Sequence, residues 1–243
     1  MVRRALLAVS LAALLVVAGC AGTSGDSGDG DGGDYPAADA VDESLIEDHS
    51  AALADTSFTE RMVTETNQAT ITQVRKLDPG DDQYLLESTG FGNSTTYTDG
   101  DQHYQRTVLE DQTQVSAVDS GVNTSVVGPS SQYLTAFVSA NVTYERDGST
   151  TFDGDDVARY TAEGLDALSE EMRNDVGENT TLQSFSGSVL VDGDGVIRKV
   201  EVDIETERDG QAQTASITVE VTDVGSTDVE EPDWVSQVGT TSA

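Results

Sequence analysis

The last third of the chain alternates apolar and acidic side chains with a period of two. Val200, Val202 and Ile204 are each separated by one carboxylate residue, and the segment 215–224 repeats the pattern with threonine and glutamate. Successive side chains of a β-strand point to opposite faces, so these segments predict strands with one apolar face and one wet face. Such strands belong to an antiparallel sheet that is covered on one side only.

The same period recurs along most of the chain. Turn signals separate the segments, such as Asp99-Gly100-Asp101, Asp192-Gly193-Asp194-Gly195 and Arg208-Asp209-Gly210. The pattern predicts strands at 58–66, 69–77, 84–89, 95–98, 102–107, 115–118, 142–146, 157–163, 184–191, 196–206 and 215–224.

Three segments instead have apolar side chains at helical spacing. The first is 41–54, where Asp39 is placed to cap the helix. The second begins after Ser130 or Ser131 and the third ends at Gly177. The apolar stripe is Tyr133, Leu134, Phe137 and Val138 in the second helix, and Leu165, Leu168, Met172 and Val176 in the third. The predicted fold class is therefore α+β, a large twisted antiparallel sheet with about three helices over one face.

The N-terminus combines Arg3 and Arg4 with an apolar segment, 5–19, that ends in Val-Ala-Gly before the single cysteine, Cys20. The segment is shorter than the roughly 20 residues that span a bilayer, and a secretory signal has this organisation. Its ending resembles the lipobox of prokaryotic lipoproteins, which implies a lipid on Cys20 and a membrane-anchored, exported protein. An ordinary uncleaved signal is the alternative. The arginine pair also resembles a twin-arginine signal, so the export route stays open.

The expected domain organisation follows from this reading. Residues 1–19 are a signal peptide, and residues 20–40 are a lipidated cysteine with a disordered linker rich in Gly, Ser and Asp. Such a linker is a flexible coil that would span roughly 25 Å. Residues 41–236 form a single α+β domain, and residues 237–243 a flexible tail.

The chain is strongly acidic. It has 45 acidic and 12 basic residues and a formal net charge of −33. A nucleic-acid partner is excluded, because phosphate binding requires basic patches. The composition resembles that of secreted proteins of extremely halophilic archaea, whose surface charges are screened at molar salt. A disordered acidic protein is the alternative, and the regular alternation argues against it.

Catalytic signatures are missing from the sequence. His49 and His103 are the two histidines, and no catalytic triad or zinc-ligand pair accompanies them. The segments 29–32 and 192–195 resemble the start of a calcium loop, but neither continues with the ligands that such a loop requires. We therefore predict no enzymatic activity, no cofactor and no metal site.

Four Asn-x-Ser/Thr triplets match the glycosylation pattern of an exported protein. They begin at Asn93, Asn123, Asn141 and Asn179.

The order of lipobox, acidic tether, amphipathic helix and long meander, with the tail 222–233, resembles an uncharacterised family of haloarchaeal lipoproteins. More distantly it resembles half-barrel lipid and lipoprotein carriers of the LolA and LppX/LprG type. This resemblance implies a half-barrel that binds a hydrophobic ligand or lipid. It does not indicate a protein partner. A structural or protein-interaction lipoprotein and an envelope hydrolase are the alternatives. The residues that would line a cavity, or else form an ordinary packed core, are Val189, Val191, Val200, Val202, Ile204, Val219 and Val221.

Overall fold

The computed structural model describes residues 41, 44–110, 112–117, 131–138, 141–174 and 179–238, and the statements below concern these residues. The predicted signal, Cys20, the linker, Asn123 and the end of the tail lie outside them. In the described part of the chain, no helix is long and apolar enough to cross a membrane.

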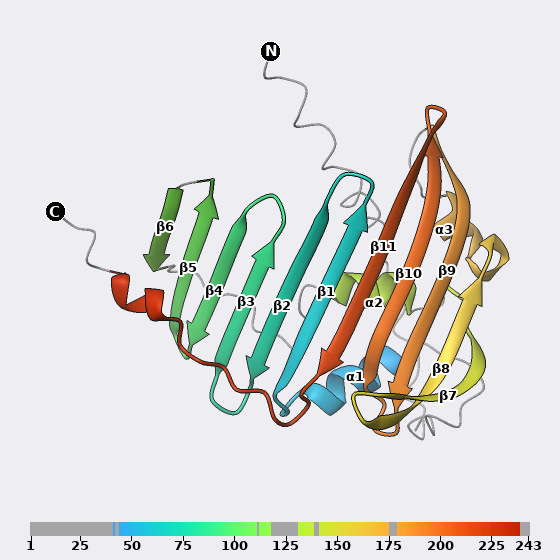
Figure 1. Ribbon diagram of the computed structural model, residues 1–243. Helices are drawn as coiled ribbons and strands as arrows, with labels where there is room; N and C mark the ends of the chain where they lie inside the picture. The colour runs from blue at the N-terminus through green and yellow to red at the C-terminus, as the bar shows by residue number, and fades with distance from the viewer. Residues whose placement is uncertain are drawn as a thin grey trace, which may run out of the picture.

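Eleven antiparallel strands form one open sheet in the order β6-β5-β4-β3-β2-β1-β11-β10-β9-β8-β7 (Figure 1). Two meanders, β1 to β6 and β7 to β11, are joined where β1 pairs with β11. The bounds are β1 (Phe58–Thr66), β2 (Thr70–Asp78), β3 (Gln83–Thr89), β4 (Asn93–Asp99), β5 (Gln102–Leu109), β6 (Gln112–Ala117), β7 (Glu145–Phe152), β8 (Asp155–Glu163), β9 (Thr180–Asp192), β10 (Ile197–Arg208) and β11 (Gln211–Thr222).

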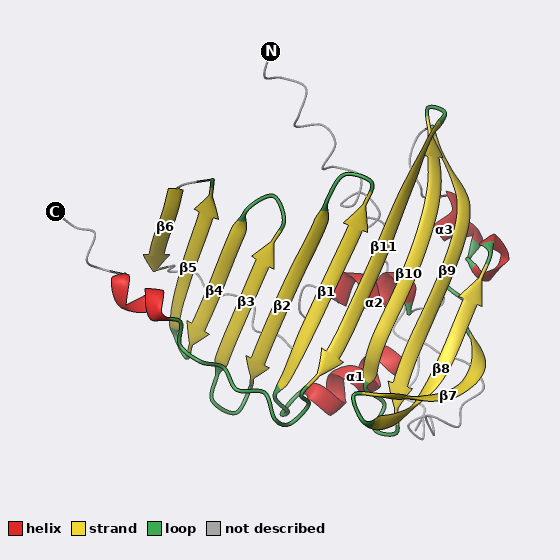
Figure 2. Ribbon diagram, in the orientation of Figure 1, coloured by secondary structure: helices red, strands yellow, loops and turns green. Residues whose placement is uncertain are grey.

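The helices are α1 (Leu45–Leu53), α2 (Ser131–Phe137) and α3 (Glu170–Asn174), with the 3-10 turns η1 (Leu165–Ala167) and η2 (Asp233–Gln237). Figure 2 shows α1 and α2 on one side of the sheet, and we call that side the inner face. A large antiparallel sheet with three α-helices confirms the predicted α+β class, and the open, twisted sheet is consistent with a half-barrel.

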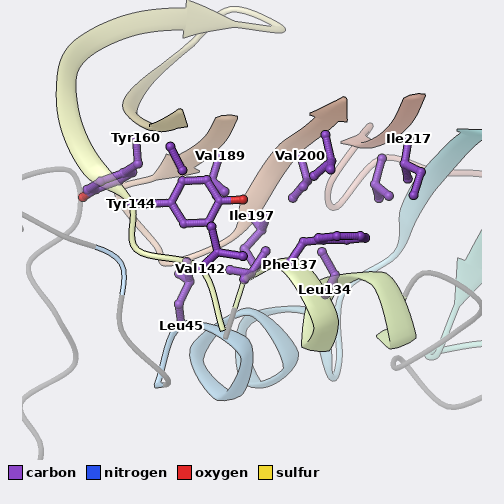
Figure 3. Close-up of a cluster of buried hydrophobic side chains, with 14 of the residues drawn as sticks. Leu45, Leu134, Phe137, Val142, Tyr144, Tyr160, Val189, Ile197, Val200 and Ile217 are labelled. Atoms are coloured by element: carbon purple, nitrogen blue, oxygen red, sulfur yellow. The ribbon is translucent and has the colours of Figure 1, made fainter. Parts of the chain in front are cut away.

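The main hydrophobic core lies between the inner face of β8 to β11 and the two helices α1 and α2 (Figure 3). Leu45 from α1 and Leu134 and Phe137 from α2 are 4 % exposed or less. They pack in one cluster with Val189 and Val200 of the sheet. The period-two pattern of the sequence thus places the apolar face of these strands correctly.

A separate cluster lies on the opposite, outer face of the sheet. The segment after β11 reaches β4, β5 and β6, where Trp234 and Val235 pack with Tyr97 and Tyr104. The two tyrosine rings stack with their centroids 6.3 Å apart. Trp234 is 9 % exposed and anchors the C-terminal segment to the sheet.

Most predicted elements differ from the observed ones by no more than about four residues at either end, but two predicted elements are wrong in a larger way. The strand predicted at 142–146 begins at Glu145 and continues to Phe152, because Gly148, with φ of 95°, forms an irregularity within the strand instead of ending it. Val142 makes only an isolated bridge to Leu168. That bridge holds Leu168 in an extended conformation (φ −93°, ψ 143°) and divides the predicted third helix into η1 and α3.

Ser169 starts the second of these pieces. Its Oγ accepts a hydrogen bond from the backbone N–H of Met172 at 3.1 Å, which is the geometry of a helix N-cap. Val176 and Gly177 lie outside the described residues, so the predicted end of the helix is not observed.

Candidate functional site

The inner face of β2 to β6 carries no carboxylate. Strand pairing fixes which side chains share this face, because residues directly opposite each other in the register point the same way. Leu77 and Tyr84 are opposite each other and buried on the inner side, and the remaining inner residues follow by alternation. We call this surface the acid-free face. Its residues are Ile71, Gln73, Arg75, Leu77, Tyr84, Leu86, Ser88, Ser94, Thr96, Thr98, His103, Gln105, Thr107, Leu109, Gln112, Gln114 and Ser116.

The single arginine of the acid-free face is neutralised within the sheet. Arg75 Nη2 donates to Glu60 Oε2 at 2.8 Å, and both side chains are nearly fully buried. The guanidinium also lies over the ring of Phe58, 5.1 Å from its centroid. Because an ion pair cancels its own charge, this part of the face presents no net charge to a ligand.

The lower end of the acid-free face is covered by α1, whereas no helix of the described residues covers its upper part. Leu53 of α1 packs with Phe58, Leu77 and Tyr84 in a second hydrophobic cluster. Above it, the side chains at Ser88, Ser94, Thr96, Gln105 and Gln114 belong to no hydrophobic cluster of the described residues. Gln105 and Gln114 are exposed. The upper part is a surface of hydroxyl and amide groups with apolar side chains at its border.

The seven residues predicted to line a cavity lie mostly in the packed core. Six of them are 2 % exposed or less and pack in hydrophobic clusters, and five of those six share the cluster of α1 and α2. Ile204 is half-buried. In the described structure the helices fill the space over these valines, and their role in ligand binding stays a prediction. The six buried residues are Val189, Val191, Val200, Val202, Val219 and Val221.

Ile204 borders a shallow trough of about 630 Å³ that crosses β1, β11, β10, β9 and the end of β8. Alternation with the buried valines directs Asp203 and Glu205 to the outer face. Serine and threonine side chains lie between the carboxylates, so the chemistry of the trough does not suit an apolar ligand. Its lining residues are Glu65, Thr66, Glu163, Gly164, Ser184, Phe185, Ser186, Asp203, Ile204, Glu205, Thr214, Ala215 and Ser216.

The histidines serve the fold. His49 is 5 % exposed, and its Nδ1 accepts a hydrogen bond from the backbone N–H of Ile197 at 3.2 Å. Burial, with a smaller contribution from the positive charge of Arg75, lowers the pKa of His49 to about 4. His103 Nδ1 lies 3.0 Å from Thr98 Oγ1. Thr98 is 1 % exposed, so its hydroxyl is enclosed by the sheet and does not face a substrate.

The calcium-like segment 192–195 is a hairpin turn between β9 and β10. Asp192 Oδ1 accepts hydrogen bonds from the backbone N–H groups of Asp194 at 3.0 Å and Val196 at 2.9 Å. Asp192 Oδ2 lies 3.7 Å from Arg198 Nη1. The carboxylate is thus used by the turn itself. Within the described ranges, no group of three or more His, Cys, Asp or Glu side chains is arranged to hold a metal ion.

Three predicted glycosylation positions lie in the described structure. Asn93, at the start of β4, and Asn179, in the turn before β9, are exposed. Asn141 is half-buried, and its backbone carbonyl oxygen accepts a hydrogen bond from the backbone N–H of Ser169 at 2.8 Å. Asn93 and Asn179 are therefore the more accessible positions for a glycan.

Fold and surface together define a single-sheet α+β protein whose inner face is covered by helices at one end and is uncharged at the other. The chain belongs to a family of unknown function (DUF7537), whose family model matches residues 5–238. A search of the curated proteins found no match.

Solved structures with a similar arrangement are distant in sequence. LprF from Mycobacterium bovis is 11% identical with a TM-score of 0.40, and the match covers 78% of this chain and 94% of that one. A LolA-superfamily protein from Nitrosomonas europaea is 11% identical with a TM-score of 0.25, covering 80% and 96%. In the MucA/MucB complex from Pseudomonas aeruginosa, the matched chain is 11% identical with a TM-score of 0.24. The match covers 73% of this chain and 93% of that one. These values do not identify what the present chain binds.

Proposed function

We propose that this protein is a lipid-anchored, non-enzymatic binding module at the outer face of the cell membrane, and that it binds a hydrophobic ligand or lipid on the acid-free face. One observation carries the proposal. In a chain with a net charge of −33, the inner side of five consecutive strands holds no carboxylate. If this surface were only exposed to solvent, we would expect it to carry carboxylates like the rest of the protein.

The chemistry of this face matches an amphiphile. Ile71, Leu86 and Leu109 offer apolar area at its border, and buried apolar area contributes roughly 25 cal/mol per Å². The hydroxyl and amide groups between them donate hydrogen bonds to the polar part of a lipid. A phosphate or carboxylate headgroup meets no like charge on this face, whereas Glu201, Asp203 and Glu205 on the outer face of β10 would repel it.

The anchor and the location rest on the sequence. The lipobox-like ending at Cys20, the acidic linker up to residue 40 and the exposed triplets at Asn93 and Asn179 all suit a protein tethered on the outside of the cell. Two lipid chains hold a protein stably on a membrane, and one chain is marginal. Cys20→Ser should therefore release the protein or leave it as an uncleaved precursor, as fractionation and intact-mass measurement would show.

Ligand binding is tested by placing one carboxylate on either side of β4. Thr96 and Thr95 are neighbours in the chain and are both half-buried, but Thr96 points to the acid-free face and Thr95 to the outer face. Each variant, Thr96→Glu and Thr95→Glu, is purified from the host in molar salt. Bound lipid is then measured by organic extraction and mass spectrometry, and the binding of a fluorescent long-chain acyl probe by titration.

We expect Thr96→Glu to lose most of the co-purified lipid and to weaken probe binding at least tenfold, with Thr95→Glu close to the unaltered protein. Gln105→Glu, an isosteric change on the same face, should act in the same direction as Thr96→Glu. Equal binding by all variants, or no lipid and no probe binding by the unaltered protein, would refute the carrier proposal.

A protein-interaction role is the second candidate, and the edge strand β6 favours it. Among the described residues β6 pairs only with β5, and its sequence Gln-Thr-Gln-Val-Ser-Ala has no charge and no proline. The opposite edge, β7, carries Glu145, Arg146 and Asp147 and an irregularity at Gly148, which are features that protect edges from pairing. A photo-crosslinker at Thr113 tests this role, since an interaction partner would be captured there and not at an equivalent position on β7.

A further inference from the structure

Two large hydrophobic side chains protrude at one end of the sheet. Phe91 is 66% exposed and Leu109 is 57% exposed, in a chain where the other described large hydrophobic residues are at least half-buried. Phe91 lies in the β3–β4 turn, and Leu109 ends β5 before the β5–β6 turn. In Figure 1 these turns, with the β1–β2 turn, form the upper end of β1 to β6, which we call the upper rim.

Two glycines join these side chains into one strip. A Cβ on Gly90 would lie 3.2 Å from Ile71 Cγ1 and 3.2 Å from the carbonyl oxygen of Thr70, so the backbone there packs directly on β2. A Cβ on Gly92 would lie 2.6 Å from Leu109 Cδ2. Ile71, Gly90, Phe91, Gly92 and Leu109 therefore form a continuous apolar strip across the upper rim, and its inner side borders the acid-free face.

Charge distinguishes this rim from the opposite one. The two lower turns of the same meander, with the strand ends beside them, carry five carboxylates. The β1–β2 and β3–β4 turns of the upper rim have none. The β5–β6 turn has Glu110, together with Asp111, which lies outside the described residues. The five lower carboxylates are Asp78, Asp81, Asp82, Asp99 and Asp101.

We propose that the upper rim docks on the lipid surface of the membrane, with Phe91 and Leu109 entering the interface between headgroups and acyl chains. Aromatic and leucine side chains bind at such interfaces, and the negative surface potential of anionic lipids repels the carboxylate-rich lower rim. Docking in this direction brings the open end of the acid-free face against the lipid, where a ligand passes between the two without crossing water.

This inference rests on the proposed function in one respect, which is the anchor that keeps the domain near the membrane. Two side chains alone give weak and reversible binding. A tether raises the effective concentration of the surface, typically to millimolar values for short flexible linkers, so a weak contact suffices for an anchored protein. The same weakness lets the domain leave the membrane again with its ligand.

The test uses tryptophan as a local reporter. Trp234 is the single tryptophan of the chain, and it is 9 % exposed where the C-terminal segment packs on the sheet, so it supplies a constant background. Phe91→Trp adds a reporter on the upper rim and Asp101→Trp adds a matched, exposed reporter on the lower rim. Each lipidated protein is reconstituted in molar salt into vesicles of phosphatidylcholine and phosphatidylglycerol in equal parts, with or without brominated acyl chains.

We expect brominated lipid to quench the added fluorescence of Phe91→Trp at least threefold more than that of Asp101→Trp. Leu109→Ser in the Phe91→Trp protein should reduce the quenching. Glu110→Gln should increase it, because a carboxylate beside the anionic surface is removed. Equal quenching at both rims, or none at either, overturns the docking proposal.

The outcomes separate this proposal from the proposed function. A protein that does not float with the vesicles has no functional anchor, and the proposed location then fails. If the protein floats with the vesicles but the Phe91→Trp reporter is not quenched, the proposal that the upper rim docks on lipid is refuted, and the proposed function is not affected. Emission at Phe91→Trp that shifts to the blue in host membranes, without quenching in pure lipid vesicles, shows that a protein covers the rim and likewise overturns lipid docking.

Discussion

The two ends of the sheet bury opposite faces. At β8 to β11, α1 and α2 cover the inner face, and the outer face holds the carboxylates Glu201, Asp203 and Glu205 in water. At β4 to β6, the C-terminal segment covers the outer face through Trp234 and Val235. Each end therefore leaves one face uncovered by a described helix or segment, but the chemistry of the two uncovered faces differs.

The two uncovered faces differ in whether they carry carboxylates. The uncovered outer face of β10 carries Glu201, Asp203 and Glu205, opposite the buried valines of its inner face, and this is the expected surface of a strongly acidic protein. The uncovered face at β4 to β6 has threonine, serine and glutamine in the same positions. General solvation would use carboxylates at both ends. The absence of acids at one end is the property that a surface for an uncharged or anionic ligand requires.

The largest effect is expected where the two ends meet. Glu60 in β1 and Arg75 in β2 form a buried ion pair between the helix-covered and the C-terminal-covered regions. Glu60→Leu removes the ion-pair partner of Arg75 and should cost about 3–5 kcal/mol of unfolding free energy. Denaturant unfolding in molar salt measures this. The double variant Glu60→Leu, Arg75→Met should recover most of the loss, and an equal loss in both would show that the charges do not depend on each other.

The helix-covered end is tested separately by Phe137→Ala. Phe137 of α2 is 3 % exposed and packs against the sheet, so its truncation should cost about 3–4 kcal/mol. Phe91→Ala is the matched control, because the same side chain at 66% exposure should change stability very little. A small loss in Phe137→Ala would mean that α2 leaves the sheet easily. The valines beneath it would then be accessible to a ligand.

Strand periodicity was sufficient to predict most of the sheet. The bounds of β1 were predicted without error. Its buried and exposed side chains alternate regularly, and Glu60 is the only charged residue on its buried side. The division of the third helix was not predictable in the same way. Leu165, Leu168 and Met172 have helical spacing, but the bridge between Leu168 and Val142 is a contact between distant segments.

The sequence also did not predict that the covered face changes from the inner one at β8 to β11 to the outer one at β4 to β6. Tyr97 is flanked by two threonines and Tyr104 by His103 and Gln105, so alternation alone does not say which side of β4 and β5 is covered. The covering residue Trp234 follows more than a hundred positions later. The same reasoning explains the candidate site. Alternation identified Val200 and Val202 as inward-facing, yet only the packing of α2 shows that the space above them is filled.

Low pH should destabilise the helix-covered end of the sheet more than the end covered by the C-terminal segment. The pKa of His49 is about 4 in the folded protein because burial disfavours the charged ring, and its ordinary value is 6.5. The unfolded chain therefore binds the proton first, and stability is lost as pH falls from 6.5 through 4, by about 3 kcal/mol at most. His49→Asn keeps an acceptor for the N–H of Ile197 without titrating. The difference between its pH–stability curve and that of the unaltered protein isolates this contribution from the many carboxylates, and identical curves would contradict it.

The smallest effect is expected at the C-terminal-covered end. Trp234→Ala should release the segment from Tyr97 and Tyr104 at a cost of about 2 kcal/mol, because a surface segment can detach without unfolding the sheet. Hydrogen exchange should then show lost protection in β4 to β6 and unchanged protection in β9 to β11. Release also uncovers the apolar outer side of β4 and β5, while the acid-free face on the inner side keeps its chemistry. Lipid binding should consequently survive in Trp234→Ala and be lost in Thr96→Glu. If both variants lost lipid, the ligand would lie under the C-terminal segment, and the uncovered inner face would not be the binding surface.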